Sequence, residues 1–272
     1  MEASKILGTS SVLSLYDLEW VALGCPGSPP SGTNVDDTFG TYSSNYVIAV
    51  VGFAAGLWLL CNPKVPQMYK VYGVMFFWCT GLGYAKAGVL QQVYHEDDEH
   101  PIHTYSWKAS YIFTLLGMLG INLLCNSILF ERFPSIGVCA KCINLVAYVG
   151  AAAIIAYIAF KNFVDASLLV TGVYSVVVTL YCLLVFALVC DWPKVLGVAL
   201  IIASYVVQVV LAPQCGGAAY ADCFKDCPLP APYFNHNALF MWLFAIGLGI
   251  LGVSMNLQPN EATEQTQFML LK

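Results

Sequence analysis

The stretch ASLLVTGVYSVVVTLYCLLVFALVC, residues 166–190, decides the fold class of this chain. It contains no charged residue, and it is longer than the roughly 20 apolar residues that a helix needs to cross a membrane. Six more windows that are mainly apolar occupy residues 45–61, 68–94, 107–130, 137–160, 193–212 and 234–255. Membrane β-strands are only about ten residues long and alternate in polarity. The sequence therefore predicts an all-α fold, a seven-transmembrane helix bundle.

The composition of the whole chain agrees with this prediction. Hydrophobic residues make up 59% of the sequence and charged residues 10%, whereas about a quarter of a soluble domain is charged. Most of the surface must therefore face membrane lipid, with other membrane proteins as further potential partners. The chain has no basic patch, which argues against nucleic acid as a partner.

The loops predict how the chain is oriented. Five cations, Lys64, Lys70, Arg132, Lys141 and Lys194, lie in or beside the first, third and fifth loops, so the positive-inside rule places these loops in the cytosol. Residues 1–44 then form a segment outside the cell or in a lumen, residues 45–257 the membrane domain, and residues 258–272 a cytosolic tail. We expect a plasma membrane or secretory-pathway membrane.

Four cysteines in polar segments, Cys25, Cys215, Cys223 and Cys227, all fall on the predicted outer side. An even number of loop cysteines on that side fits an oxidising compartment. We expect two disulfides, for which three pairings are open. The other seven cysteines lie in or beside apolar runs and are interpreted as small buried hydrophobic residues.

Lys86 is the one charged residue deep within a predicted span. A lysine inside a membrane is costly and indicates a functional role. It lies about two turns from the outer boundary, however, so its ammonium group can also reach the headgroup region without any further role.

Polar side chains recur at helical spacing toward the outer side of the predicted bundle. Tyr84, Gly88, Gln91, Gln92 and His95 share one helical face, and the other polar stripes are Thr171, Ser175 and Thr179, and Ser204 with Gln208. Amides inside a membrane need partners from other helices. These residues predict either a polar outer cavity or hydrogen bonds that hold the bundle together.

Histidines next to carboxylates suggest a metal site at the same side. His95 ends the second span, His100 and His103 follow it, and His236 opens the seventh span between two asparagines. Imidazole and carboxylate are zinc ligands, and a catalytic zinc needs three protein ligands and an open position for water. His95, His236 and His100 are the candidate ligands, with Asp97 or Asp98 as proton acceptor. The alternative is that residues 95–103 form a solvated acidic loop.

A histidine at the end of the second helix and another at the start of the seventh resemble the superfamily of alkaline ceramidases and adiponectin receptors. That resemblance implies a zinc near one membrane face, held by a histidine of helix two and an HxxxH pair of helix seven. His95 and His236 match two of these positions, but Phe240 stands where the third histidine is expected. The third span also lacks the aspartate that assists in this superfamily. A site completed by His100 or His103, or a degenerate relative, is then implied.

Two functions stay open at this point. One is a zinc-dependent hydrolase of a lipid amide or ester, in which the metal activates water and polarises the carbonyl. The other is a non-catalytic membrane protein: a receptor, a small-solute conductor or an accessory subunit of a membrane complex. The sparse charge within the spans argues against an ion-coupled transporter.

Overall fold

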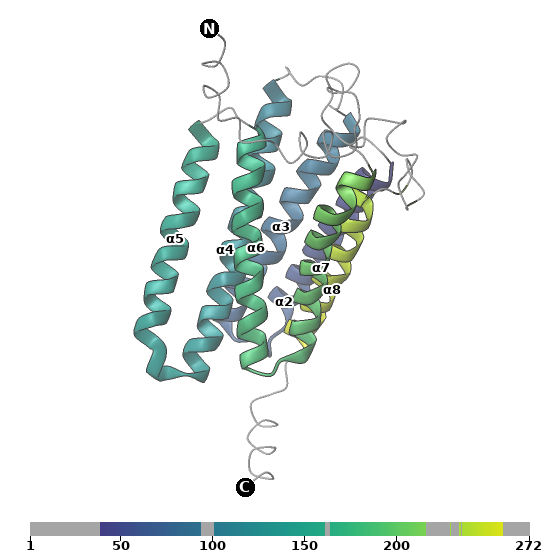
Figure 1. The fold of residues 1–272 in the computed structure, drawn as a ribbon. Helices are drawn as coiled ribbons and strands as arrows, with labels where there is room; N and C mark the ends of the chain where they lie inside the picture. Colours follow the sequence, from purple (N-terminus) through teal and green to yellow (C-terminus); the bar gives the residue numbers. More distant parts are fainter. Residues whose placement is uncertain are drawn as a thin grey trace.

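A computed structural model describes residues 39–93, 101–160, 164–215, 229, 234 and 236–257 of the chain. These residues form seven long helices and one short 3₁₀ turn, and none of them lies in a strand. The elements are α2 (Phe39–Cys61), α3 (Gln67–Val93), α4 (Pro101–Arg132), η1 (Pro134–Ile136), α5 (Gly137–Phe160), α6 (Val164–Leu188), α7 (Trp192–Cys215) and α8 (His236–Asn256). The long helices stand side by side, and successive ones run in opposite directions (Figure 1).

Six of these helices are long and apolar enough to cross a membrane, namely α2, α4, α5, α6, α7 and α8. The prediction of an all-helical, multi-pass chain is thus supported over the described residues. The remaining helix, α3, carries Lys70, Lys86 and several glycines and has no stretch as apolar as those of the other six. It packs along both α2 and α4.

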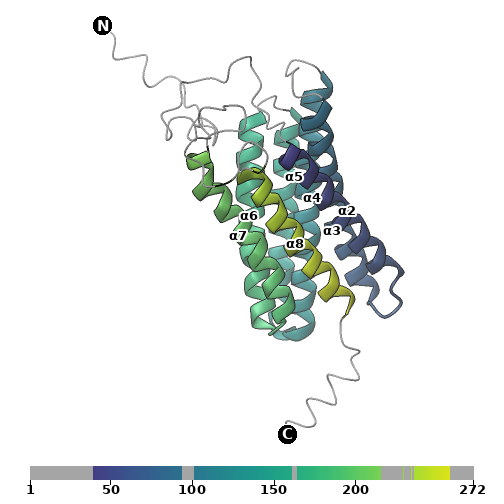
Figure 2. The same ribbon diagram turned by 90° about the vertical axis from the view of Figure 1, so that its right-hand side faces the viewer.

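Helix contacts close a ring. The order around the ring is α2, α3, α4, α6, α7, α8 and back to α2, and α5 lies outside the ring against α4. Figure 2 shows α8 between α7 and α2. We call the end of the bundle where α8 begins the His236 end, and the end where α7 begins the Lys194 end.

Close packing of α3 in this ring depends on residues without side chains. A Cβ atom built on Gly52 of α2 would lie 2.7 Å from the carbonyl oxygen of Phe77, and one on Gly120 of α4 would lie 2.8 Å from the amide nitrogen of Phe76. Small residues let membrane helices approach backbone to backbone. Gly247 makes the same contact for α7 and α8, since its Cβ would lie 2.6 Å from the carbonyl oxygen of Gly197.

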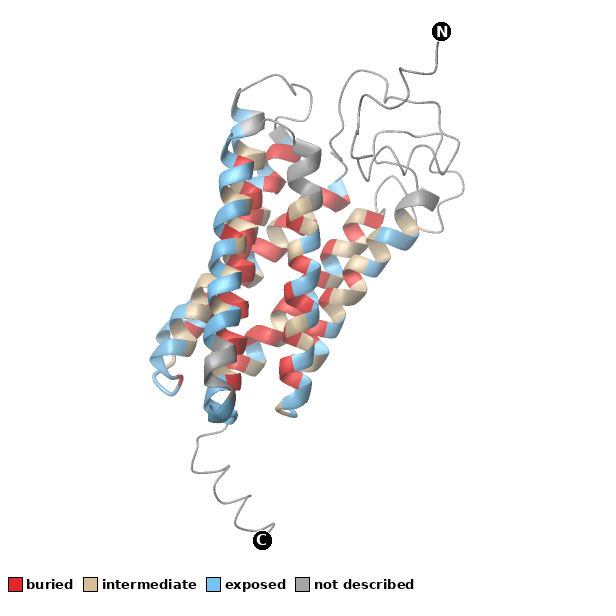
Figure 3. Cartoon of the chain, turned by 60° about the vertical axis from the view of Figure 1, so that its left-hand side comes forward, coloured by how far each residue is buried: buried red, intermediate tan, exposed pale blue. Residues whose placement is uncertain are grey.

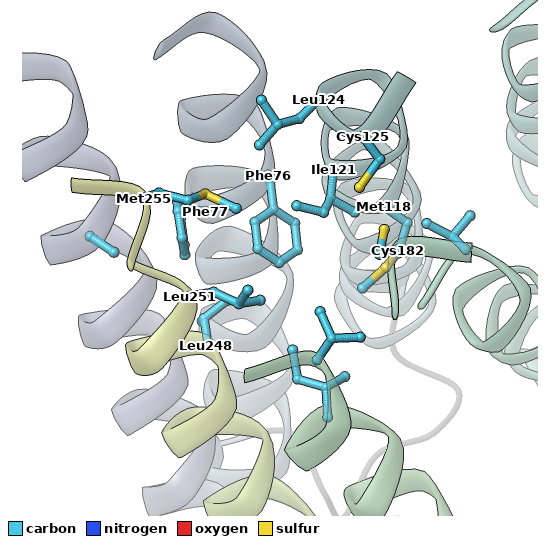
Figure 4. Close-up of a cluster of buried hydrophobic side chains, with 14 of the residues drawn as sticks. Phe76, Phe77, Met118, Ile121, Leu124, Cys125, Cys182, Leu248, Leu251 and Met255 are labelled. Carbon is cyan, nitrogen blue, oxygen red and sulfur yellow. The ribbon is translucent and has the colours of Figure 1, made fainter. Parts of the chain in front are cut away.

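Buried residues face the inside of the bundle, and exposed ones, mostly apolar, cover its outside (Figure 3). The largest buried cluster joins all six ring helices and includes Phe76, Phe77, Phe186, Phe244 and Leu248. Figure 4 shows part of this cluster, with Phe76, Phe77 and Leu248 among the labelled residues. An apolar exterior around an apolar core is expected of a protein whose solvent is lipid.

Several helix ends differ from the predicted spans, such as the start of α4, at Pro101 instead of residue 107, and the end of α7, at Cys215 instead of residue 212. α2 begins at Phe39 rather than at residue 45, so part of the predicted outer segment is helical. α6 ends at Leu188 because Cys190 adopts a left-handed backbone, with φ of 58°. The amide of Asp191 then donates to the carbonyl of Phe186, and that of Cys190 to Ala187, which is a Schellman end.

The turn from α6 into α7 also determines the environment of Lys194. The sequence placed this lysine at the cytosolic edge of the predicted span 193–212, and the structure places it in the first turn of α7, where only 2% of it is exposed. Its ammonium group pairs with Asp191, which precedes the helix. A buried, paired lysine in a membrane protein is therefore found at Lys194, and Lys86, the sequence candidate, is exposed on α3.

Candidate functional site in the His236 half of the bundle

His236 opens α8 and is only 1% exposed, so its imidazole lies inside the protein. The flanking sequence gives the reason, because a polar Asn-His-Asn cluster is too costly to face lipid. The next residue, Asn237, accepts a hydrogen bond of 2.8 Å from the Nε2 of Gln208 on α7. The start of α8 is thus anchored to α7 through neutral amides.

The other predicted metal ligands cannot be placed beside His236. His95, Asp97, Asp98 and His100 lie outside the described residues, and of His103 only the backbone in α4 is described. Within the described part of the chain, no three His, Cys, Asp or Glu side chains could together hold a metal ion. The zinc site and its proton acceptor therefore remain predictions. The same applies to the disulfides, because Cys25, Cys223 and Cys227 are not described, and of Cys215 only the backbone at the end of α7.

Phe240, which replaces the histidine implied by the resemblance, belongs to an aromatic group. Its ring centroid lies 5.8 Å from that of Tyr205 on α7 and 6.2 Å from that of Phe244. Phe244 in turn lies 5.1 Å from Tyr84 on α3. Aromatic pairs favour such separations. This aromatic group joins α3, α7 and α8 just below His236.

Polar contacts join α2 to its two neighbours at the same end. The Nδ2 of Asn45 donates to Gln91 on α3, and the hydroxyl of Tyr46 donates to Gln92 at 2.7 Å. Toward α8, the hydroxyl of Ser44 donates to the sulfur of Met241 at 3.2 Å. Asn45 and Ser44 are buried, so amides and hydroxyls, not carboxylates, hold these helices together.

The stripe Thr171, Ser175 and Thr179 on α6 is buried, as the polar spacing predicted. Thr179 donates to the backbone oxygen of Ser175 at 2.6 Å, and both side chains lie near the hydroxyl of Tyr205 on α7. The sequence missed Tyr205 as a member of this group. The sequence contained a weak indication of this role, because Tyr205 adjoins Ser204 and lies three residues before Gln208, the two residues of the polar pair predicted on this helix.

Several buried polar atoms of this half find no hydrogen-bond partner in the structure. Among them are the Oδ1 of Asn45 on α2, the Oγ1 of Thr171 on α6 and the Oε1 of Gln208 on α7. Asn45 is completely buried and Thr171 is 4% exposed. Leaving such an atom without a partner costs about 1–3 kcal/mol, so native proteins rarely do so without a functional reason.

No protein-family model matches the chain, and no curated protein and no solved structure is similar to it. Function must therefore be argued from the residues themselves.

Proposed function

We propose that the chain is a seven-span integral membrane protein whose His236 half binds a small uncharged polar molecule from the outer side. The seventh span is α3. It has 27 residues and would extend about 40 Å at 1.5 Å per residue. Because it packs along α2 and α4 and runs opposite to both, it crosses wherever they cross. An odd number of spans then separates Phe39 from Asn256, in agreement with the positive-inside rule.

The observation that carries the binding function is the set of unpartnered atoms of Asn45, Thr171 and Gln208. Two are amide oxygens, which accept hydrogen bonds, and the third belongs to a hydroxyl, which can do both. A molecule with several hydroxyl or amide groups would satisfy them. The rings of Tyr84, Tyr205 and Phe240 would supply the apolar wall that small-molecule sites usually have.

Charge favours a neutral ligand. Apart from the buried imidazole of His236, the two lysines described near this end lie toward the periphery: Lys86 is exposed, and Lys108 donates a hydrogen bond to the backbone oxygen of Ala159 on α5. An ion bound among these helices would lack a counter-charge, and a buried unpaired ion is expensive. Neutral donors and acceptors point to recognition or passage of a solute, not to ion coupling.

A second candidate is the zinc-dependent hydrolase, and the burial of His236 favours it. His236 would hold the ion with His95 and His100, and Asp97 or Asp98 would accept the proton of the attacking water. When bound, zinc lowers the pKa of that water to about 7 and polarises the substrate carbonyl. Only His236 of this set is described, so the described residues alone do not supply a zinc site.

The sign of a stability change tests the binding function. Thr171→Val keeps the side-chain shape and removes a buried hydroxyl that has no partner, so we expect the free protein to become more stable by about 1 kcal/mol. The control is Thr114→Val. The hydroxyl of Thr114 donates a hydrogen bond of 3.0 Å to the backbone oxygen of Ser110, so its removal should make the protein less stable by a similar amount. Unfolding in mixed detergent micelles measures both. If Thr171→Val destabilises the protein as Thr114→Val does, the hydroxyl is structural.

Ligand and metal measurements separate the two candidates. A panel of glycerol, inositol, glucose, urea and acetamide should contain a compound that raises the melting temperature of the wild type, as binding to the native state requires. The same compound should have no effect on Gln208→Leu. Stoichiometric zinc in the purified protein that is lost in His236→Ala would instead support the hydrolase. Zinc bound equally well by both proteins would contradict it.

A further inference from the structure

Two cysteines of neighbouring helices meet in the core of the Lys194 half, about one turn beyond Thr179 toward the Lys194 end. Cys125 of α4 is completely buried, and Cys182 of α6 is 1% exposed. A side-chain hydrogen bond joins them. Figure 4 shows both within the large apolar cluster, together with Met118, which lies two turns from Cys125 on the same face of α4.

A buried cation lies beside this thiol pair. The ammonium group of Lys194 is near Cys125 and stands 6.0 Å from the ring centroid of Phe186, a completely buried residue of α6. Burying a lysine within a membrane bundle is costly, so a lysine found there usually has a function. Burial favours the neutral thiol of Cys125, and the nearby cation partly offsets this effect when a metal ion binds the thiolate. The carboxylate partner of Lys194, Asp191, is 29% exposed. The ion pair therefore lies between the surface turn and the buried thiols.

We propose that Cys125 and Cys182 bind a soft monovalent metal ion, Cu(I), inside the Lys194 half of the bundle. Thiolate and thioether sulfurs select Cu(I) over harder ions, and the thioether of Met118 is the third candidate ligand. Zinc is not expected here, because its structural sites take four ligands. This site is independent of the neutral-ligand site at the His236 end.

Lys194 lowers the electrostatic cost of the bound state. Two thiols give up two protons to solvent as one Cu(I) ion binds, which leaves a dithiolate complex with one negative charge. The ammonium group of Lys194, which also pairs with Asp191, attracts that charge inside the apolar bundle, where electrostatic interactions are strong, so Lys194, Asp191 and the complex together carry one net negative charge. No electron is transferred, and the ion stays Cu(I) throughout.

The test is an anaerobic titration of the full-length protein in detergent micelles with Cu(I), in competition with the chelator bicinchoninate. We expect the wild type to hold one tightly bound equivalent that is lost in both Cys125→Ser and Cys182→Ser. The matched control is Cys190→Ser, an exposed thiol on the α6–α7 turn, which should keep that equivalent. Lys194→Met should keep the site but weaken it about tenfold, as expected for a group next to the ligands.

Two further measurements keep the proposal falsifiable if a serine variant fails to fold. Cys182→Ala, checked by its melting temperature, replaces the thiol without a new polar atom. In native membranes, Cu(I) should protect Cys125 and Cys182 together from N-ethylmaleimide, as read by mass spectrometry. Equal Cu(I) binding by the wild type and Cys182→Ala would overturn the proposal, and so would a disulfide between the two cysteines in the unreduced protein.

Discussion

Asp191 illustrates at the scale of one residue how this chain tolerates a charge inside an apolar bundle. Its carboxylate pairs with Lys194 three residues later, and its backbone oxygen accepts the first hydrogen bond of α7 from Val195. Forming this ion pair costs little chain entropy, because both partners lie on one short turn. The free-energy cost of burying the ammonium group would appear only if Asp191 were removed.

Asp191→Ala should therefore destabilise the protein by about 3 kcal/mol, because it leaves the ammonium group of Lys194 buried without a counter-charge. The measurement is unfolding in a detergent titration. Glu131→Ala is the control: Glu131 is exposed and accepts a hydrogen bond of 2.6 Å from the hydroxyl of Tyr69. A loss of under about 1 kcal/mol is expected there. Equal losses in both variants would show that Lys194 is not electrostatically dependent on Asp191.

At the scale of helices, the ring and the outer helix are held by different means. The ring helices approach closely at glycines, whereas α5 touches the bundle mainly through α4. A polar network fixes α5: Asn126 of α4 donates to Asn122 at 2.9 Å and to Asn144 of α5, and it accepts from the hydroxyl of Tyr181 on α6. Apolar faces alone would not set this position, because lipid competes equally well for them.

A matched pair of glycine variants tests the packing of the ring. Gly120→Ala places a methyl group against the backbone of Phe76 and Tyr72 in α3, so α3 and α4 must separate, at a cost of about 1–3 kcal/mol. Gly150→Ala on α5 meets no atom within 4 Å and should be neutral or slightly stabilising, because alanine favours helix. The difference in unfolding free energy is the measurement. If both variants behave alike, the helices do not pack as described.

Asn126→Leu should release α5 without opening the ring. It removes the partner of Asn144 and Tyr181, with an expected loss of about 1–2 kcal/mol. Hydrogen exchange followed by mass spectrometry should show faster exchange in α5 and little change in α7 or α8. The control is Ser127→Ala, since the hydroxyl of Ser127 bonds only within its own helix, to Leu123 at 2.9 Å. Faster exchange throughout the protein would contradict a local role for Asn126.

For the whole molecule, the alternating helix directions predict which residues share a side of the membrane. Cys61 ends α2 and Cys190 lies in the turn before α7, so both belong to the Lys194 end, and both are exposed. A membrane-impermeant maleimide added to intact cells should leave both unlabelled, and permeabilisation should expose both. Mass spectrometry locates the label. Labelling of both from outside would invert the orientation, and labelling from opposite sides would contradict the crossing of α3.

The sequence by itself determined the helical class and nearly every helix. Hydrophobic length is a local property, and glycine, proline and charge mark the turns where the backbone must leave the helix. It also indicated the buried polar stripe of α6, because a threonine or serine every fourth residue stays on one face. The backbone of Cys190 was not predictable, since a left-handed residue there follows from how α6 meets α7.

Only the tertiary structure decided which polar residues lie together. Lys194 lies next to a loop in the sequence, and only the packing of α7 in the bundle buries it. Cys125 and Cys182 are 57 positions apart in the sequence, and the contact of α4 with α6 brings them together. The closed ring, with α5 outside it, also depends on side-chain contacts between distant segments. Helix formation depends on residues that are neighbours along the chain. A site depends on residues that are neighbours in space, and the packing of the helix faces decides which residues these are.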